Sequence, residues 1–392
     1  MDGIDTQATT EKPMNPGAYF FSGDYTARLD VYDTAQVEGF AARLIEQGVA
    51  HDHVITPEHA RVVANSIGPE FQVTVICGAV NSKRDVIKGM TTTTEIDLAE
   101  GHLLYLEDIV VMPTERRKGF AGQLIANNLL DAWNEGIFAG YAWETGRSNI
   151  AAHQLYKRID PAFDADKLHD VWRFSDRKIN RIANNRDIPS GHGHLADLND
   201  LNAIAGTLHN QPDKNLGHIS EILRRQHGHK TNGFNDPSFI VASTKSNSFA
   251  MISTGYSTFD GSRRSNGWIY GYSSPDDISD LIKGVSKEIV RRKWRGSVHL
   301  EFANNVISLN EERLRKEKDN VTKAEDVLKT LGGEKLIHDN NTMVGYRLTG
   351  ERYVKAIIDA VTRNPNYPLR ADRKEDLVRE ARRYGLGFGQ AA

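Results

Sequence analysis

The chain has 392 residues, of which 39% are hydrophobic and 26% are charged, and its net charge is −3. A single hydrophobic core rarely serves more than about 250–300 residues, so this length predicts two domains. The composition excludes a disordered or fibrous chain, and no apolar run approaches the roughly 18 residues of a membrane-spanning helix. The polar N-terminus and the single cysteine, Cys77, argue against a secretory leader and a disulfide framework, so we expect a cytoplasmic α/β protein.

Charge is unevenly distributed along the chain. Acidic residues outnumber basic ones in residues 1–178, whereas basic residues outnumber acidic ones in residues 179–392. An acidic half suits a cationic small substrate, and a basic half suits a polyanion, so contact of the clusters at 224–230 and 291–295 with nucleic acid stays open. For the cluster at 291–295, cations that complement the C-terminal end of a helix are the favoured explanation.

Hydrophobic periodicity predicts the elements of the first half. They are strands at 27–32, 71–80 with a hairpin partner, 103–111, 138–144 and 171–175, and helices that start near residues 34, 119 and 149. The segment after them is polar and rich in turn-forming residues, which predicts a linker at 179–192 between a first domain at 1–178 and a second at 193–349.

The order of elements then repeats. The second half is expected to contain helices from 197 and 276 and strands at 239–243, 249–254, 268–272, 298–302 and 343–348. This recurrence predicts a diverged internal duplication. Residues 350–392 form a predicted helical extension, interrupted at Asn364-Pro365 and Tyr367-Pro368 because proline ends a helix.

A basic, glycine-containing turn between the strand at 103–111 and the following helix is the most informative part of the sequence. It reads Arg116-Arg117-Lys118-Gly119-Phe120-Ala121-Gly122. The N-terminus of a helix presents unpaired backbone N–H groups and a positive dipole end, which together favour a phosphate or diphosphate. Taken alone, the turn is better explained as an ordinary strand-to-helix turn with a solvated basic cluster.

Two spaced motifs strengthen the first interpretation. Arg116-x-x-Gly119-x-Ala121 and the later Asn149-x-x-Ala152-x-x-Leu155-Tyr156 together resemble the acyl-CoA diphosphate loop and the helix after the fifth strand in the GNAT acyltransferase superfamily. The resemblance extends over residues 27–175, and Ala121 stands where a second glycine is usual. It implies an α/β (α+β) fold of two tandem GNAT-like domains, each a mixed, mostly antiparallel sheet flanked by helices, with acetyl-CoA as co-substrate and no metal.

The strand from Leu104 to Asp108 also resembles the fourth strand of the diamine (spermidine/spermine) N-acetyltransferases, in which its glutamate is the favoured base. The resemblance therefore implies Glu107 as the base, and Tyr156 is expected to protonate the departing thiolate. Glu144 is expected at the substrate as a reserve base. Asp108 is expected either at the substrate or as a capping or structural carboxylate, and the two alternatives stay open. The expected cofactor contacts are Ile109, Val110, Val111, Arg116, Arg117, Lys118, Gly119, Phe120, Ala121, Gly122, Asn149 and Ala152.

The function implied is transfer of an acetyl group from acetyl-CoA to a primary amine, with a small cationic amine as the preferred acceptor. Two alternatives remain open: an acceptor amine on a protein, tRNA or modified nucleic acid, and a non-catalytic regulator that only binds acyl-CoA. The His-x-His pairs at 51/53, 192/194 and 227/229 are interpreted as loop histidines, because no carboxylate or thiol spacing completes a metal site.

The second half lacks the acyl-CoA motifs. At the position of the diphosphate loop it reads Tyr272-Ser273-Ser274-Pro275-Asp276-Asp277, and two carboxylates at a helix start would repel an anion. We therefore expect a degenerate copy that serves as a built-in partner, an intramolecular pseudo-dimer with one active site. The sequence leaves the oligomeric state open, and no membrane partner is expected.

Overall fold

The computed structural model describes most of the chain after residue 83, together with three earlier strands. The described ranges are 19–21, 24–29, 71–80, 84–111, 113–164, 168, 170–185, 193–209, 214–227, 238–256, 263–271, 275–294, 296–303, 322–338 and 341–387. The helix expected after Asp33 lies outside them. Two compact units are present, one formed by residues 1–92 and 108–128 and the other by residues 93–107 and 129–392.

The first unit contains an antiparallel set of strands. β1 (Tyr19–Phe21) pairs with β2 (Asp24–Leu29), and β2 pairs with β3 (Phe71–Val80), followed in the sheet by β4 (Arg84–Leu98). The unit also includes the last residues of β5 (Gly101–Val111) and the first turns of α3 (Phe120–Glu135).

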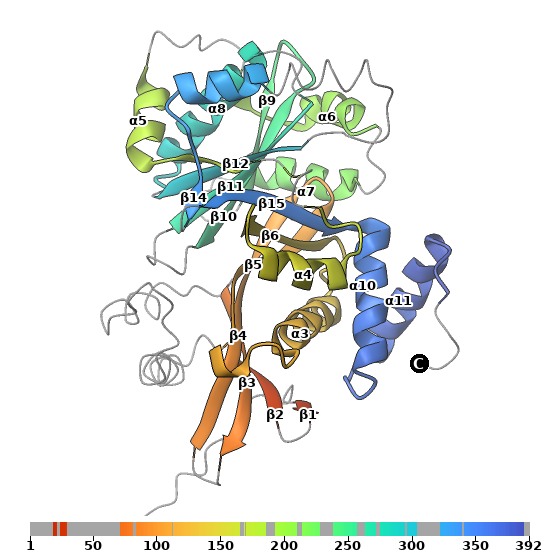
Figure 1. Cartoon of the computed structure of the whole chain (residues 1–392). Coiled ribbons are helices and arrows are strands. Elements are labelled where there is room, and N and C mark those ends of the chain that lie inside the picture. The colour runs from red at the N-terminus through yellow and green to blue at the C-terminus, as the bar shows by residue number, and fades with distance from the viewer. Residues whose placement is uncertain are drawn as a thin grey trace, which may run out of the picture. The chain divides into compact units, whose positions relative to one another are not determined.

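The second unit holds two sheets, both visible in Figure 1. In the first of these the strand order is β4–β5–β6–β15–β14. β5 runs parallel to β6 (Gly140–Gly146), whereas β6 is antiparallel to β15 (Asn341–Thr349), which in turn pairs with β14 (Ile337–His338). The helix α3 connects the parallel strands, and α4 (Ile150–Ile159) follows β6.

The second sheet has the order β13–β7–β12–β11–β10–β9–β8. Its strands are β7 (Trp172–Phe174), β8 (Gly193–Leu195), β9 (Ser238–Ser243), β10 (Phe249–Tyr256), β11 (Arg263–Tyr270), β12 (Ser297–Ala303) and β13 (Glu334–Lys335). β11 and β12 are parallel and are connected by α8 (Pro275–Arg291), while the other pairs are antiparallel. The two mixed sheets flanked by helices confirm the predicted fold class.

The last strand of each half pairs with a strand of the other half. β7 belongs by sequence to the first half but pairs with β12 of the second sheet, and β15 belongs to the second half but pairs with β6 of the first. Packing explains the exchange: Trp172 and Phe174 are buried in the core of the second sheet, whereas Tyr346 packs on Trp143 of β6 with ring centroids 4.6 Å apart. The expectation that residues 171–175 would close the first half is therefore wrong.

A helix also occupies part of the predicted linker. α5 spans Asp176–Asn184, and Ile179 and Ile182 on its apolar face are buried in the core of the second sheet. Apart from Ala183 its remaining residues are polar, which is why composition suggested an irregular segment. The boundaries at 178 and 193 stay a prediction.

Further helices complete the second half and the extension. They are α6 (Leu201–Thr207), α7 (Leu216–His227), α10 (Gly350–Arg363) and α11 (Ala371–Arg383). The last two confirm the predicted helical extension. None of the described helices combines the length and apolar character needed to cross a membrane.

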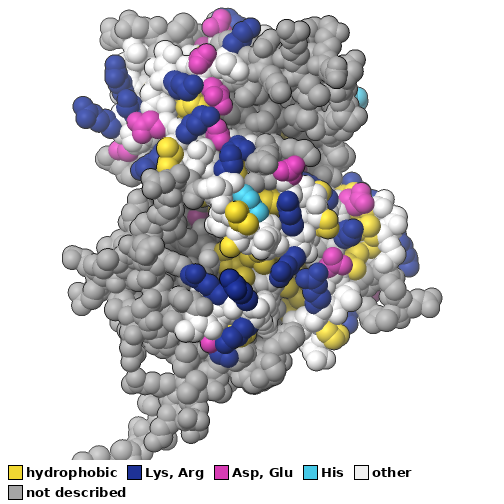
Figure 2. Space-filling model, viewed as in Figure 1, with side chains coloured by type: hydrophobic (Ala, Val, Ile, Leu, Met, Phe, Trp, Pro, Cys, Tyr) yellow, Lys and Arg dark blue, Asp and Glu magenta, His cyan; other side chains and the backbone are white. Residues whose placement is uncertain are grey.

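The basic side chains do not form a continuous stripe on the described surface seen in Figure 2, where Lys and Arg groups stand among Asp and Glu. In the cluster at 291–295, α8 ends at Arg291, as expected for cations at a helix C-terminus. Arg292 is buried, bonds to Glu288 with its Nε 2.6 Å from Oε1, and stacks over Phe239. Its guanidinium therefore makes contacts inside the protein and does not belong to an exposed basic surface.

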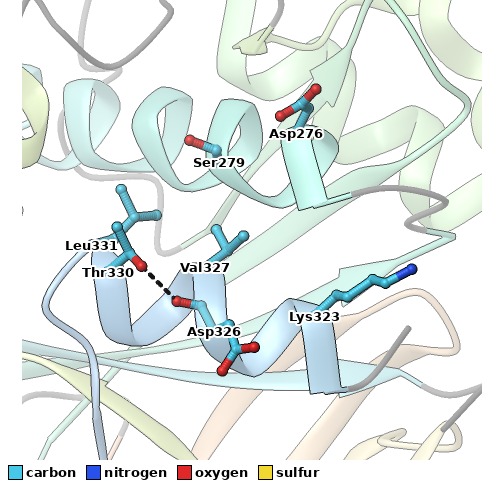
Figure 3. Close-up of a pocket in the computed structure, with 7 residues that line it drawn as sticks. All are labelled: Asp276, Ser279, Lys323, Asp326, Val327, Thr330 and Leu331. Atoms are coloured by element: carbon cyan, nitrogen blue, oxygen red, sulfur yellow. Dashed lines mark hydrogen bonds between the residues drawn. The ribbon is translucent and has the colours of Figure 1, made fainter. Parts of the chain in front are cut away.

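A cavity of about 390 Å³ lies between α8 and a helix at 322–330 (Figure 3). Its lining residues are Asp276, Ser279, Lys323, Asp326, Val327, Thr330 and Leu331. A second cavity of about 460 Å³ borders β7 and residues 333–337. Neither cavity is lined by a residue that the sequence places in the active site.

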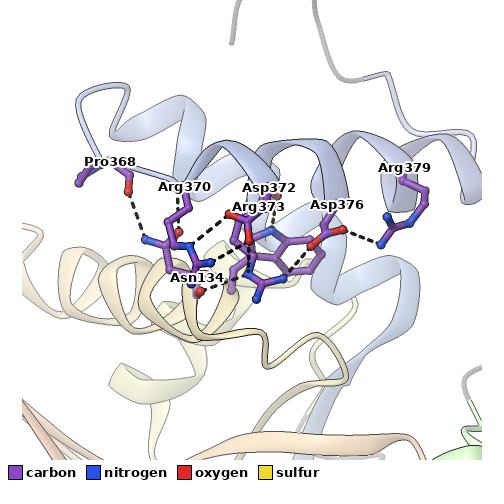
Figure 4. A network of polar contacts seen from close by, with 8 residues as sticks. Asn134, Pro368, Arg370, Asp372, Arg373, Asp376 and Arg379 are labelled. Carbon is purple, nitrogen blue, oxygen red and sulfur yellow. Dashed lines mark hydrogen bonds and ion pairs between the residues drawn. The ribbon is translucent and has the colours of Figure 1, made fainter.

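The helical extension is fastened to the C-terminal end of α3 (Figure 4). Trp133 donates from Nε1 to the carbonyl oxygen of Arg373 at 2.9 Å, and the Asn134 side chain bonds to the backbone of Pro368 and Arg370. Arg373 also forms an ion pair with Asp376 at 2.9 Å, and hydrogen bonds from Arg373 and Arg379 hold the pKa of this carboxyl below its ordinary value. The extension thus braces the helix that follows the basic turn.

Candidate active site

The basic turn lies in the first unit and has an unusual backbone. A 3₁₀ turn at Pro113–Glu115 precedes Arg117 and Gly119, which have φ values of 67° and 90°. Such left-handed residues turn successive N–H groups toward one side, and the start of α3 at Phe120 adds a positive helix end. A Cβ at Gly119 would meet nothing within 4 Å, so glycine is required by the backbone angle and the space beside it is open.

The side chains of the turn suit an anion. Those of Arg116, Arg117 and Lys118 are exposed, although Lys118 lies 3.1 Å from Glu115 and Arg116 donates to the carbonyl oxygen of Val111 at 3.3 Å. Phe120 is buried against Leu124, with Val111 packed on both, and anchors the start of α3. Ile109, Ala121 and Gly122 are half-buried, and the side chain of Val110 lies outside the described part of the chain. The predicted cofactor residues from Ile109 to Gly122 thus form one continuous strand–turn–helix segment.

Two predicted carboxylates occupy equivalent places on neighbouring strands of the second unit. The paired residues of β5 and β6 run from Leu103 and Gly140 to Leu106 and Trp143. Glu107 and Glu144 are the next residues on each strand. Because side chains alternate along a strand, Glu107 shares the face of Tyr105, and Glu144 shares the face of Ala142, the register partner of Tyr105. Both carboxylates therefore lie on the same face of the first sheet.

Glu107 has a partner that the sequence analysis missed. The hydroxyl of Thr94 on β4, which is completely buried, donates to Glu107 Oε1 at 2.7 Å. This bond fixes the orientation of a half-buried carboxylate. The available signal was the run of four threonines at 91–94, which is unusual for a buried strand, since each hydroxyl there needs a hydrogen-bond partner.

Glu144 lies in a layer of charged side chains. Its Oε1 is 3.4 Å from Nδ1 of His299 on β12, and both side chains are at least nine-tenths buried. Gly345, the register partner of Glu144 on β15, is in close contact with Glu301: a Cβ there would lie 2.0 Å from the Glu301 carboxylate. The absence of a side chain at Gly345 gives a second carboxylate its place near Glu144.

The residues expected from the second motif are located on α4. Asn149 caps this helix, because its side-chain oxygen accepts from the N–H of Ala152 at 3.2 Å. Tyr156 is only 3% exposed and packs on Trp143 and Phe163 with ring centroids 4.6 and 5.4 Å away. Asn149 is exposed, so the helix face that it shares with Ala152 and Tyr156 extends from solvent into an aromatic cluster. The Asp108 side chain lies outside the described residues.

The second half offers no comparable anion site among its described residues at the start of α8. Asp276 and Asp277 occupy the first turn, and Asp277 is buried. Residues 272–274, the rest of the segment expected to have lost the diphosphate loop, lie outside the described part. The two carboxylates at this helix end disfavour a bound diphosphate.

Among the described residues, no group of three or more His, Cys, Asp or Glu side chains is arranged so that it could hold a metal ion. Of the His-x-His pairs, His194 bonds to Asp200 at 2.9 Å and His227 to the carbonyl oxygen of Ala196 at 2.5 Å. The other four histidines of these pairs lie outside the described ranges.

The segment that contains these residues matches the model of a known protein family. Residues 64–160, about a quarter of the chain, match the model of the acetyltransferase (GNAT) family. The matched segment includes the basic turn, Glu107, Glu144 and Tyr156, so residues 64–160 correspond to a GNAT acetyltransferase domain. A search of curated proteins found no match.

Several solved structures are similar over part or most of the chain. They are a ribosomal-protein-S18-alanine N-acetyltransferase from Escherichia coli (20% identity, 39% of this chain and 82% of that chain, TM-score 0.27), a Drosophila protein (11%, 83% and 98%, 0.39) and a spermidine N-acetyltransferase from Vibrio cholerae in complex with CoA and spermine (17%, 35% and 80%, 0.25). At TM-scores of 0.39 or less, these likenesses do not identify a substrate for this chain.

Proposed function

We propose that the protein is an acetyl-CoA-dependent N-acyltransferase that transfers an acetyl group directly to a primary amine, and that the acceptor is a small cationic amine. The observation that supports it most is the family match over 64–160, which includes both the basic turn and Glu107. The test is release of CoA thiol from acetyl-CoA with a panel of amines, followed by mass spectrometry of the product. Absence of acetylated product with every amine class, including peptide and tRNA amines, would refute the proposal.

The acceptor must lose a proton before it attacks. An alkyl amine has a pKa of about 10.4, so roughly one molecule in 10³ is neutral at pH 7. A carboxylate at the site can bind the ammonium form and then accept its proton, directly or through one water. In the proposed assignment Glu107 is this base, and the Thr94 hydroxyl holds one of its oxygens in place.

Once the amine nitrogen has bonded to the thioester carbon, the carbon–sulfur bond breaks and CoA leaves as a thiolate. Protonation converts the thiolate into a thiol, which is a poor nucleophile, and a tyrosine hydroxyl can donate that proton. The second proton that the amine nitrogen loses on forming the amide can restore the hydroxyl, directly or through water. Tyr156 is the proposed donor. Its ring is held by Trp143 and Phe163, which limits the positions its hydroxyl can reach.

The second half is proposed as a degenerate GNAT-like copy. Both sheets place antiparallel strands before one parallel pair, and a helix connects the parallel strands in each. Each sheet also receives its next strand from the other half of the chain. This arrangement supports an intramolecular pseudo-dimer with one acetyl-CoA site per chain.

Gly119→Asp should abolish acetyl-CoA binding. The substitution places a carboxylate beside the diphosphate and forces an L side chain into a backbone with φ of 90°. Calorimetry should give one acetyl-CoA site per wild-type chain and none in the folded variant. Gly119→Ala imposes the same backbone strain without the charge and should bind more tightly than the aspartate variant. Unchanged affinity in Gly119→Asp, or two sites in the wild type, would contradict these assignments.

Tyr156→Phe should reduce turnover roughly 10²-fold, the lower range for loss of a general acid, with acetyl-CoA affinity retained. The ring stays, so its packing on Trp143 and Phe163 is preserved. Tyr353→Phe is the matched control, because it removes a buried hydroxyl that donates to the Ile137 carbonyl oxygen at 2.9 Å on a different helix. The control should alter the melting temperature and leave turnover unchanged. If Tyr156→Phe turns over as fast as Tyr353→Phe, a group other than Tyr156 protonates the departing thiolate.

A further inference from the structure

The second sheet packs on the face of the first sheet that carries Glu107 and Glu144. One continuous apolar cluster contains Leu103, Tyr105 and Ala142 of the first sheet together with Trp268 and Tyr270 of the second. Glu107 lies on the face of Tyr105, and Glu144 lies on the face of Ala142. The second half of the chain therefore lies against the sheet face that carries both carboxylates.

Polar side chains of the second sheet point into this layer. Asn266 alternates with Trp268 and Tyr270 on β11, and its register partner on β12 is His299. Since paired residues of neighbouring strands share a face, His299 and Glu301 also point toward the first sheet. The contact between His299 and Glu144 and the proximity of Glu301 to Gly345 agree with this placement.

Asn266 is unusual among them because it is 2% exposed and neither its oxygen nor its nitrogen has a hydrogen-bond partner among the described residues. The indole nitrogen of Trp268 on the same face is likewise buried without a partner in that part of the chain. Leaving buried polar groups unpaired is costly, and native proteins retain them where water, an ion or a ligand completes their bonds or where they have a functional role.

The charges of this layer indicate the kind of ligand. Glu107, Glu144 and Glu301 supply three carboxylates and Glu100 a fourth, whereas Arg347, which lies 3.4 Å from Glu100 and also interacts electrostatically with Glu301, supplies one guanidinium. An amide oxygen such as that of Asn266 accepts from an ammonium group, and an acidic buried layer favours cations.

We infer that the second sheet forms the acceptor wall of the proposed active site, where Asn266 and the Glu144–His299 pair bind a second cationic group of a diamine or polyamine acceptor. This inference rests on the proposed function. Asn266 accepts a hydrogen bond from the distal ammonium group, and His299 orients Glu144 toward it. The degenerate half therefore determines which amine is acetylated.

The test compares a diamine with a monoamine of equal chain length. Asn266→Leu and His299→Gln should each raise the KM for the diamine about tenfold, the effect of one lost hydrogen bond, while kcat and the KM for acetyl-CoA stay near wild type. The monoamine should be affected less than threefold in both variants, because it has no group to contact this wall. Equal effects on diamine and monoamine would overturn the inference.

Matched controls separate specificity from folding. His194→Gln makes the same change in another histidine–carboxylate pair, with Asp200, at the β8 edge of the same sheet, and should leave both KM values unchanged. Asn266→Asp keeps an oxygen acceptor and should restore diamine selectivity lost in Asn266→Leu. Unchanged selectivity in the leucine variant would contradict the inference.

Binding distinguishes this inference from the proposed reaction. Calorimetric titration of the full chain with the diamine, in the presence of CoA, should show a site that Asn266→Leu weakens. If wild type binds the diamine through Asn266 but forms no acetylated product, the wall is supported and the acyl transfer is wrong. If wild type acetylates amines and the variant binds the diamine equally well, acyl transfer holds and the wall is wrong. Absence of diamine binding also overturns the wall.

Discussion

Glu107→Gln should lower the rate of amine acetylation at pH 7 by roughly 10² or more, while acetyl-CoA binding persists. The glutamine keeps the size of the side chain and can still accept from Thr94, but it has neither the charge nor the basicity of a carboxylate. Raising the pH supplies neutral amine without help from the protein, so the variant should recover relative activity as the pH approaches the pKa of the amine. Initial rates of thiol release from pH 7 to 10 measure this recovery.

Three further variants show whether a loss of rate in Glu107→Gln comes from the loss of a base. Glu95→Gln removes the same charge from a half-buried carboxylate on β4, paired with His102, and should leave the chemical rate unchanged. Thr94→Val removes only the hydroxyl that donates to Glu107 and should lower the rate of amine acetylation about tenfold. If the rate of Glu107→Gln is reduced equally at every pH, Glu107 positions the substrate and is not the base. If the rate is unchanged, another group is the base, and Glu144→Gln is the next variant to measure.

Asp97→Asn should destabilise the folded chain by about 3–5 kcal/mol at pH 6, as expected when one partner of a buried ion pair is removed. The Asp97 carboxylate on β4 is buried and accepts from Ser238 of β9, with His102 Nδ1 at 3.0 Å and His218 Nε2 at 3.1 Å. It therefore links the first sheet to α7 and β9 of the second half. Chemical denaturation of wild type and variant measures the difference.

The pH dependence of stability provides a check on this cluster. Partial burial disfavours the charged imidazolium of His102, but hydrogen bonds with Asp97 and Glu95 outweigh it and raise its pKa from 6.5 to about 9. The folded state thus holds this proton more tightly than the unfolded state, so its stabilising contribution is complete below pH 6.5 and is lost as the pH rises to about 9. The wild-type advantage over Asp97→Asn should shrink across that interval.

The carboxyl group titrates in the opposite sense. Burial raises the pKa of Asp97, yet its bonds with His102, His218 and Ser238 hold it far below the ordinary value of 3.8. Its contribution is therefore present above pH 3.8 and is lost only in stronger acid. A constant difference between wild type and Asp97→Asn from pH 5 to pH 10 would contradict the assigned protonation states.

Local pattern predicted most strands and the helix after the basic turn, because their signals lie within short windows. α3 begins at Phe120, one residue from its expected start, and β9, β10 and β12 coincide with their predictions to within two residues at each end. α7 was missed because its polar face and terminal Arg224 and Arg225 obscured the buried positions Ile219 and Leu223.

The sequence did not predict which strands pair with each other or which buried polar side chains are in contact. The apolar runs of β7 and β15 predict strands but do not say which sheet each joins, since both sheets offer an edge beside a parallel strand. Thr94 and His299 were missed for a related reason: each meets its carboxylate from another strand, and no spacing along the chain relates them. The assignments of Glu107 and Tyr156 came from motifs, and their roles remain predictions.

The exchanged strands impose an order on synthesis and folding. Trp143 pairs with Tyr346, about 200 residues later in the chain, so the first sheet cannot be completed until nearly the whole chain has been made. Until then the edge of β6 presents unpaired backbone groups, which invite pairing with another chain. A chain cut between the halves would leave each fragment without the strand that the other supplies. Each half therefore depends on the other for a strand of its sheet, and we expect the two halves to fold together.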